Sequence, residues 1–154
     1  MADRTAGPGT RPTDPIVEEG EATEPLWEAL AGFQAEATGP LTFTANLRPS
    51  SVAGFLSLLD PERWSAQAHA GNGIVRAHAK GEVELETLAP EIDRLRAEAV
   101  RDGGNLVLPR CPVEWKDRLK VWGDPRPDWD IAVKIKQALD PGAILNPGRF
   151  VATI

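Results

Sequence analysis

The sequence lacks several features that would assign a function at once. One cysteine, Cys111, in 154 residues excludes an internal disulfide and a cysteine-ligated iron–sulfur cluster. Its apolar runs are short and its first residues have no apolar core, so we expect neither a membrane span nor a secretory signal. Phosphate loops, Rossmann glycine sets, nucleophile elbows and zinc-finger spacings are also missing from the sequence.

Positive charge is scarce as well. The formal net charge is -6, which argues against nucleic acid as a partner, because phosphate binding needs clustered lysine and arginine. Hydrophobic residues make up 42% and charged residues 26%, as in an ordinary soluble domain. We therefore expect a cytoplasmic protein. Cys111 precedes Pro112 and has no evident base beside it, so we interpret it as an inert thiol.

The N-terminal part differs in composition from the rest. Residues 1–25 are rich in proline, glycine, threonine and glutamate without an apolar period, which predicts a disordered tail or linker. Residues 26–154 are predicted to form the folded domain. Within it, Leu26, Leu30 and Phe33 have the spacing of a short amphipathic helix.

The central block alternates between strand and helix patterns. Apolar and polar residues alternate over 41–47, and further strands are predicted at 64–70, 73–79 and 105–108. A helix capped by Ser50 or Ser51 is predicted after the first strand, and a long one over 85–101 ending at Gly103-Gly104. The order βαββαβ predicts a ferredoxin-like α+β sandwich, with an antiparallel sheet and helices on one face. A final helix over 129–139 and an extended tail follow.

The first candidate site is the predicted hairpin over 69–78. Glycines at a tight turn let a ligand approach the backbone, and imidazoles bind anions or move protons. The alternative is a plain hairpin with a histidine on either strand. No cysteine or carboxylate cluster accompanies these histidines, so we predict no metal site. The candidate residues are His69, Asn72, Arg76 and His78.

Two further candidates lie nearer the C-terminus. The turn Asn146-Pro147-Gly148-Arg149 exposes amides and a guanidinium, which suit a pyrophosphate or a flavin edge. The alternative for this segment is a terminal strand on the domain's own sheet. The alternating charges over 116–124 indicate a solvated face. The tryptophans at 115, 122 and 129 are seven residues apart and suggest one stripe, which either packs on the core or forms a docking surface.

Several of these motifs occur in the order found in one family. The glycine hairpin, Gly103-Gly104 before Leu106-Val107-Leu108, Trp122-Gly123, and Asp140-Pro141 before Asn146-Pro147-Gly148-Arg149 resemble the C-terminal part of FAD-linked oxidases of the vanillyl-alcohol-oxidase type. The resemblance is strongest to the glycolate oxidase E-subunit family. In flavin-linked relatives the hairpin reads His-Ala-Gly-Asp-Gly-Asn-Leu-His. Here Asn72 replaces the aspartate, and Arg76 stands where the second histidine would be.

The resemblance implies a function as well as a fold. It implies the substrate-side cap of an FAD-dependent oxidoreductase acting on a 2-hydroxy acid such as glycolate. The substrate would be bound by His69, Asn72, Arg76 and His78, and one edge of the flavin by Asn146, Pro147, Gly148 and Arg149. The FAD would be shared with a missing FAD-binding domain or a flavoprotein subunit. Electrons would leave through an iron–sulfur subunit, in a complex that can associate with a membrane.

Other functions stay open on the residues alone. The chain also fits a non-catalytic, ferredoxin-like interaction subunit that stabilises a flavoprotein complex. A small ligand-sensing domain is a third interpretation, and it depends on the fold only. If the chain is the cap of an FAD-dependent enzyme, we expect it to be inactive in isolation, because no FAD-binding domain is present in its sequence.

Overall fold

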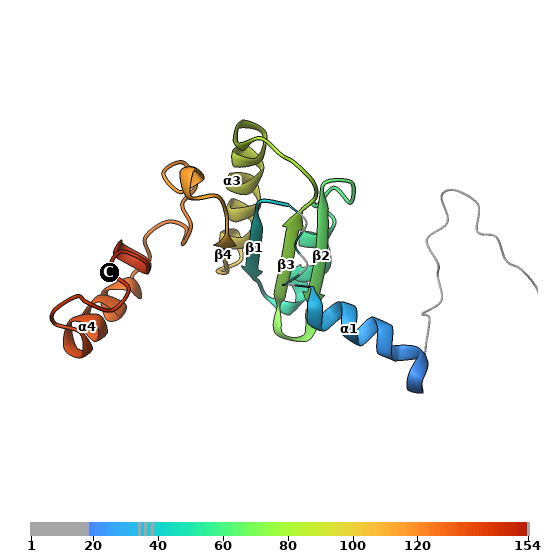
Figure 1. Ribbon diagram of the computed structural model, residues 1–154, viewed down its shortest axis with the longest axis horizontal. Coiled ribbons are helices and arrows are strands. Elements are labelled where there is room, and N and C mark those ends of the chain that lie inside the picture. Colours follow the sequence, from blue (N-terminus) through green and yellow to red (C-terminus); the bar gives the residue numbers. More distant parts are fainter. Residues whose placement is uncertain (1–18, 34, 36, 38, 154) are drawn as a thin grey trace, which may run out of the picture. The chain divides into compact units, whose positions relative to one another are not determined.

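The computed structural model describes residues 19–33, 35, 37 and 39–153 (Figure 1). The chain divides into two compact units, residues 1–34 and 35–154. The first unit holds a 3₁₀ helix, η1 (Gly20–Thr23), and the predicted amphipathic helix, α1 (Glu24–Gly32). Residues 20–25 are therefore helical, against our expectation, because Pro25 and Glu24 both suit a first helical turn. The rest of the predicted tail, residues 1–18, lies outside the described residues.

The second unit is built around a four-stranded sheet in the order β2-β3-β1-β4. Every neighbouring pair of strands is antiparallel. Together with the two connecting helices, this order is that of the predicted ferredoxin-like α+β fold. The strands are β1 (Thr42–Asn46), β2 (Trp64–His69), β3 (Ile74–Ala79) and β4 (Asn105–Arg110).

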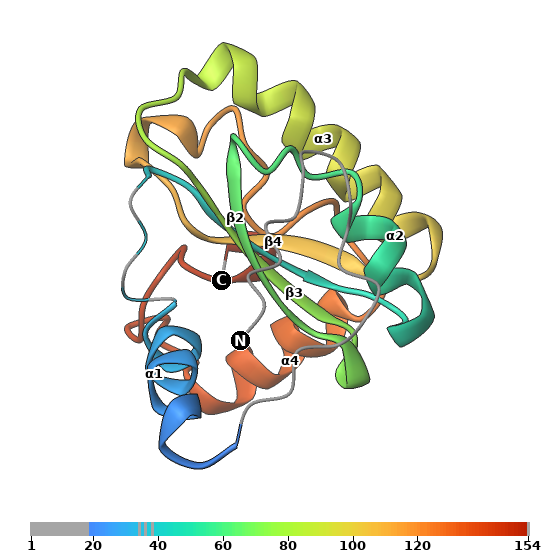
Figure 2. The ribbon, with the colours of Figure 1, turned by 90° about the vertical axis from the view of Figure 1, so that its right-hand side faces the viewer.

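Two helices cover one face of this sheet (Figure 2). The short helix α2 (Val52–Leu56) follows a 3₁₀ turn, η2 (Pro49–Ser51), and the long helix α3 (Leu85–Arg101) has the predicted bounds. Phe43, at the centre of the core, lies edge-on to Phe55 and Trp64, with ring centroids 6.2 and 5.1 Å away. The layer between helices and sheet excludes water almost completely; its largest fully buried side chains are Phe43, Leu41, Leu88, Ile92, Leu95, Leu106, Leu119 and Val75.

The C-terminus of α3 forms as the sequence predicts, but the N-terminus of α2 does not. Gly103, at φ +79°, donates its N–H to Val100 O at 2.8 Å and ends α3, as predicted. Ser51 occupies the N-cap position of α2, but its side chain makes no capping bond. Its hydroxyl donates instead to the Asp102 carboxylate at 2.6 Å. The predicted serine cap is therefore wrong, because a charged acceptor from beyond α3 takes the hydroxyl.

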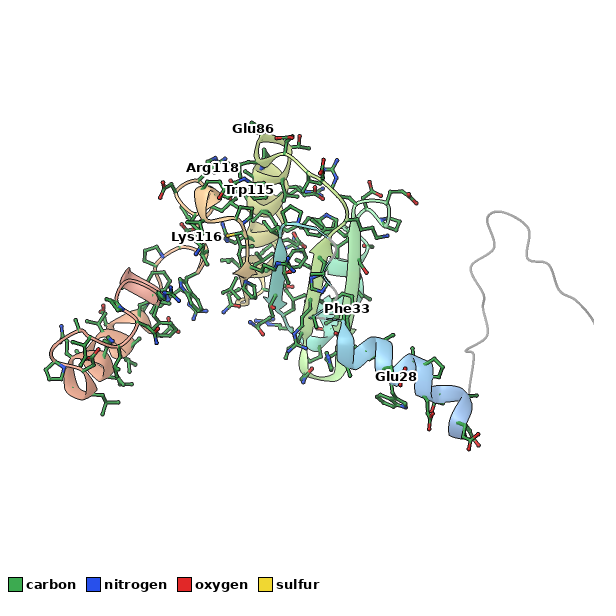
Figure 3. All side chains as sticks on the ribbon, viewed as in Figure 1. Glu28, Phe33, Glu86, Trp115, Lys116 and Arg118 are labelled. Atoms are coloured by element: carbon green, nitrogen blue, oxygen red, sulfur yellow. The ribbon has the colours of Figure 1, made fainter. Side chains whose placement is uncertain are left out.

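After β4 the chain forms a 3₁₀ turn, η4 (Val113–Trp115), a loop, the helix α4 (Trp129–Leu139), and a last 3₁₀ turn, η5 (Val151–Thr153). Trp115 is half-buried and packs against the core, and Lys116 and Arg118 extend from the same loop (Figure 3). The three tryptophans do not form one stripe: Trp115 in η4 packs against the core, Trp122 contacts Phe150, and Trp129 begins α4. No helix in the described part of the chain combines the length and apolarity needed to cross a membrane.

Candidate functional site

The face of the sheet opposite α2 and α3, which we call the open face, is polar and carries positive charge. Alternate residues of each strand lie on it, and the register pairs Thr42 with His78 and Arg76 with both Thr44 and Gln67. None of the strand residues on this face is a carboxylate, although the chain as a whole is acidic. These residues are Thr42, Thr44, Asn46, Ser65, Gln67, His69, Ile74, Arg76, His78, Asn105, Val107 and Arg110.

Two pairs of side chains organise the open face. The Thr42 hydroxyl and His78 Nδ1 lie 2.8 Å apart, and both residues are buried. Arg76 Nη1 lies 3.5 Å from His69 Nε2. Because a guanidinium can only donate, His69 Nε2 is the acceptor in this contact.

The structure brings three of the four predicted hairpin residues onto one face. His69, Arg76 and His78 share the open face, since they come from β2 and β3 at positions of the same parity in the ladder. Asn72 lies apart from them, exposed in the turn η3 (Ala70–Asn72). A turn joins the two strands where one was predicted, but it is a 3₁₀ turn in which Gly73, and not Asn72, has positive φ. Gly73 has φ +74°, and a Cβ atom there would fall 1.9 Å from Leu47 O, so a side chain cannot be accommodated.

This arrangement is suited to a small anion. The Arg76 guanidinium and the exposed His69 imidazole can together donate hydrogen bonds to a carboxylate, whereas the Thr42 hydroxyl and His78 are buried and bond to each other. Arg110, at the edge of the same face, also donates to Ala37 O at 3.4 Å. No group of three or more metal-ligating side chains lies among the described residues. The chemistry that the face can provide is therefore binding and orientation of an anion, with imidazole nitrogens available for proton transfer.

Among the open-face residues that sequence reasoning did not single out are Thr42, Gln67 and Arg110. Alternation in the first strand placed Thr42 opposite the apolar positions, but nothing in the sequence paired it with His78, which lies 36 residues away. Gln67 is 8% exposed and stands beside Arg76. The register of the strands is the missing information, because it decides which polar residues become neighbours.

The second candidate site begins with a polar clasp at the end of α4. Asp140 accepts hydrogen bonds from the amides of Ile144, at 3.0 Å, and Leu145, at 2.9 Å, and an ion pair from Lys136. The bond from Lys136, followed by those from the amides, lowers the pKa of Asp140 to about 2. This clasp holds Ala143 at φ +49°, a conformation that costs an alanine about 1–2 kcal/mol.

The predicted flavin-edge residues follow the clasp as an exposed turn. The Arg149 amide donates to Asn146 O at 3.3 Å, and Asn146 and Gly148 have φ of +48° and +71°. The Arg149 side chain makes no hydrogen bond or ion pair with the rest of the described chain. Phe150 lies edge-on to Trp122 at 5.1 Å, and Val151 is buried. The alternative of a terminal strand is excluded for the described residues, whose sheet has β1 to β4 only.

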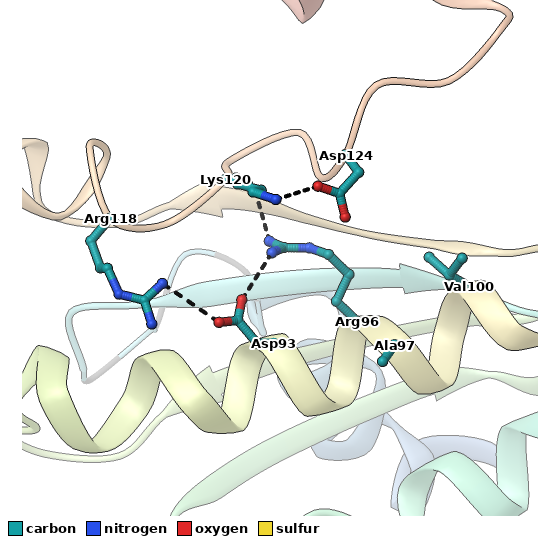
Figure 4. Close-up of a pocket in the computed structure, with 7 residues that line it drawn as sticks. All are labelled: Asp93, Arg96, Ala97, Val100, Arg118, Lys120 and Asp124. Atoms are coloured by element: carbon teal, nitrogen blue, oxygen red, sulfur yellow. Dashed lines mark hydrogen bonds and ion pairs between the residues drawn. The ribbon is translucent and has the colours of Figure 1, made fainter.

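The charged stretch 116–124 forms one side of a polar pocket of about 360 Å³ against α3 (Figure 4). Buried Arg96 donates to Lys120 O at 2.6 Å and to Asp93 at 3.4 Å. Burial lowers the pKa of Arg96, while Asp93 and Asp124 raise it. Arg118 pairs with Asp93 at 3.5 Å, and Lys120 pairs with Asp124. Arg96, Arg118 and Lys120 therefore already have partners. Their contacts join the loop to α3, and little positive charge remains to bind a ligand.

Cys111 has no reactive environment. Burial raises the pKa of its thiol, with nearby Glu114 adding to the effect and Lys116 opposing it. The thiol therefore stays protonated, in the unreactive form.

Comparison with known proteins found no relative. The sequence matches no protein-family model, and neither a curated protein nor a solved structure matches the chain.

Proposed function

We propose that this chain is the substrate-side cap of an FAD-dependent oxidoreductase that acts on a 2-hydroxy acid such as glycolate. One observation carries the proposal: in a chain with net charge -6, the open face gathers Arg76, Arg110, His69 and His78 without a strand carboxylate. The order of sequence motifs, which resembles that of the glycolate oxidase E subunit, supports the same function.

In this proposal Arg76 binds the substrate carboxylate. Arg76 stands between Thr44 and Gln67 in the ladder, and its guanidinium contacts His69 at the end of β2. His69, which is exposed beside Arg76, offers its second ring nitrogen to the substrate. His78 lies two residues beyond Arg76 on β3; it is buried and bonded to Thr42, so it supports the strand that carries Arg76.

The described residues fit one edge of a flavin and no more. The turn at 146–149 offers main-chain amides and Arg149, whereas the sequence has no glycine-rich loop for the pyrophosphate. FAD, when bound, accepts the hydride from the hydroxyl-bearing carbon. A partner domain or flavoprotein subunit must hold most of it, so the purified chain alone should carry no stoichiometric flavin.

A second candidate function is supported by the outer face of α4. Ile131, Ile135 and Leu139 recur at helical spacing and are 60%, 54% and 79% exposed. With Leu145 and Phe150 they line an apolar groove of about 550 Å³. Such a surface favours a docking role, in which the chain stabilises a flavoprotein complex without touching the substrate.

An affinity experiment separates the two functions. The tagged full chain, used as bait in its native cells, should retain a flavoprotein whose absorbance is bleached by glycolate or D-lactate. Arg76→Gln should retain the flavin but lose the bleaching if the open face binds substrate. Ile135→Asp should lose the flavoprotein under either function. If the flavin retained by wild type and by Arg76→Gln is bleached equally, only the docking function remains. If the tagged chain retains no flavoprotein, both proposed functions are ruled out.

A further inference from the structure

The two edges of the sheet differ in how far they are protected. At β4 the strand carries Pro109, a register shift opposite Thr42–Thr44, and a hydrogen bond from the Leu108 amide to Val121 O at 2.8 Å. Proline, irregular pairing and a covering loop are the means by which proteins prevent an edge strand from pairing with another chain. The β4 edge is therefore closed.

At β2 none of these devices is present in the described residues. Residues 64–70 contain no proline and no lysine, arginine or carboxylate. Lys80 N donates to Arg63 O at 2.8 Å, so these two residues form a hydrogen-bonded pair. Because such pairs alternate along an antiparallel ladder, the odd-numbered residues of β2 are the ones whose main chain bonds to β3. The main-chain groups of Ala66 and Ala68 therefore point away from the sheet, and both residues are exposed.

We propose that β2 pairs with β2 of a second copy of this chain across a twofold axis at Gln67. Ala66 of one copy then lies opposite Ala68 of the other, and the two residues exchange both main-chain hydrogen bonds. The chemistry of the edge selects this partner, because open N–H and C=O groups in a strand are satisfied best by another strand.

The edge is complementary to itself on both of its faces. On the helix side, alanine meets alanine, so no bulky side chain prevents close approach. On the open face, Ser65 of one copy meets His69 of the other, and a hydroxyl and an imidazole can hydrogen-bond. No like charges oppose each other over these residues. The paired area is small, so the dimer should be weak and depend on concentration.

Sedimentation velocity of the full chain, from about 10 to 500 µM, tests the proposal. The wild type should shift from monomer toward dimer over this range. A double variant, Ala66→Lys with Ala68→Lys, should stay monomeric, because lysines then face lysines across the axis. Ala53→Lys with Ala97→Lys is the matched control: it adds the same charge at exposed positions of α2 and α3 and should dimerise like the wild type.

A mixing experiment excludes misfolding as the explanation. Ala66→Glu with Ala68→Glu should also be monomeric alone, yet an equimolar mixture of the glutamate and lysine variants should form dimers at least as tight as those of the wild type. A wild type that stays monomeric at the highest concentration would overturn the proposal. So would a lysine variant that still dimerises, or a mixture that stays monomeric.

Discussion

The sandwich and the segment after α4 are held together by different kinds of contact. In the sandwich, side chains such as Phe43, Leu88 and Ile92 are completely buried between helices and sheet. In the C-terminal segment, Ile144 and Leu145 are 80% and 60% exposed, and the bonds of Asp140 hold the segment in place. Burial makes the first region cooperative, whereas a polar clasp can open locally and leave the rest folded.

The largest difference between the two regions should appear on removing an aromatic ring from each. Phe43→Ala should lower the free energy of unfolding by about 3–5 kcal/mol, because it leaves a cavity beside Phe55 and Trp64. Phe150→Ala removes a half-exposed ring that touches Trp122, and should cost about 1 kcal/mol or less. Urea unfolding followed by circular dichroism measures both. Similar losses would show that the C-terminal segment belongs to the cooperative core.

A polar contact inside the sandwich should have an intermediate effect. Glu91 accepts from Arg63 and from Trp64 Nε1, both at 2.8 Å, and so joins α3 to the start of β2. Glu91→Gln should lower the free energy of unfolding by about 1.5 kcal/mol, as for hydrogen bonds to a charged group. Glu98→Gln, on the same helix, breaks a pair with largely exposed Arg101 and should cost less than about 0.5 kcal/mol. Equal losses in the two variants would contradict a special role for Glu91.

Opening the clasp should affect the C-terminal segment alone. Asp140→Asn should speed amide exchange at Ile144 and Leu145 by roughly tenfold and leave exchange in β1 and β3 unchanged. Acid should have the same effect in the native chain. The carboxylate has its pKa lowered from 3.8 to about 2, so its contribution is complete above pH 4 and is lost as the pH falls through 2. Exchange in the sandwich that rises in parallel would show that the two regions are coupled.

The smallest effect on stability is expected at Arg149. Its side chain bonds to no other described residue, so Arg149→Ala should change the free energy of unfolding by no more than about 0.5 kcal/mol. In a complex with a flavoprotein, the same variant should slow turnover by roughly tenfold, if it loses one charge-assisted contact of about 1.5 kcal/mol. Arg149→Lys should retain part of the turnover. An unfolded Arg149→Ala chain with normal turnover per folded molecule would indicate a structural role instead.

Much of the fold could be predicted from local sequence, because local signals define its elements. The apolar spacing from Leu85 to Ala99 and the glycines that follow give α3 its bounds, and the strands differ from prediction by a few residues at most. The contacts of the candidate site depend on long-range pairing. His78 contacts Thr42 because of the register of β1 and β3. The Ser51 hydroxyl bonds to Asp102, which lies 51 residues away, and does not cap α2.

The bonds of Asp140 were also not predictable from the sequence, although they span only a short stretch of chain. Asp140-Pro141 signals the end of a helix, and α4 does end there. Its carboxylate reaches the amides of Ile144 and Leu145 because Ala143 adopts a left-handed conformation, which the sequence does not favour at an alanine. Sequence patterns predict where the chain turns, but the polar side chain that directs the turn is identified only from the folded structure.

Cations on the open face of an acidic chain have a consequence for the rate at which an anion would arrive. At low ionic strength an approaching carboxylate first meets the repulsion of the net charge of -6. Arg76 and Arg110 outweigh this repulsion only close to the face, and added salt shortens the range of the repulsion, since the Debye length falls from about 30 Å at 0.01 M to about 8 Å at physiological salt. Added salt would therefore accelerate encounter while it weakens the bound state, so the rate and the affinity of anion binding would respond to salt in opposite directions.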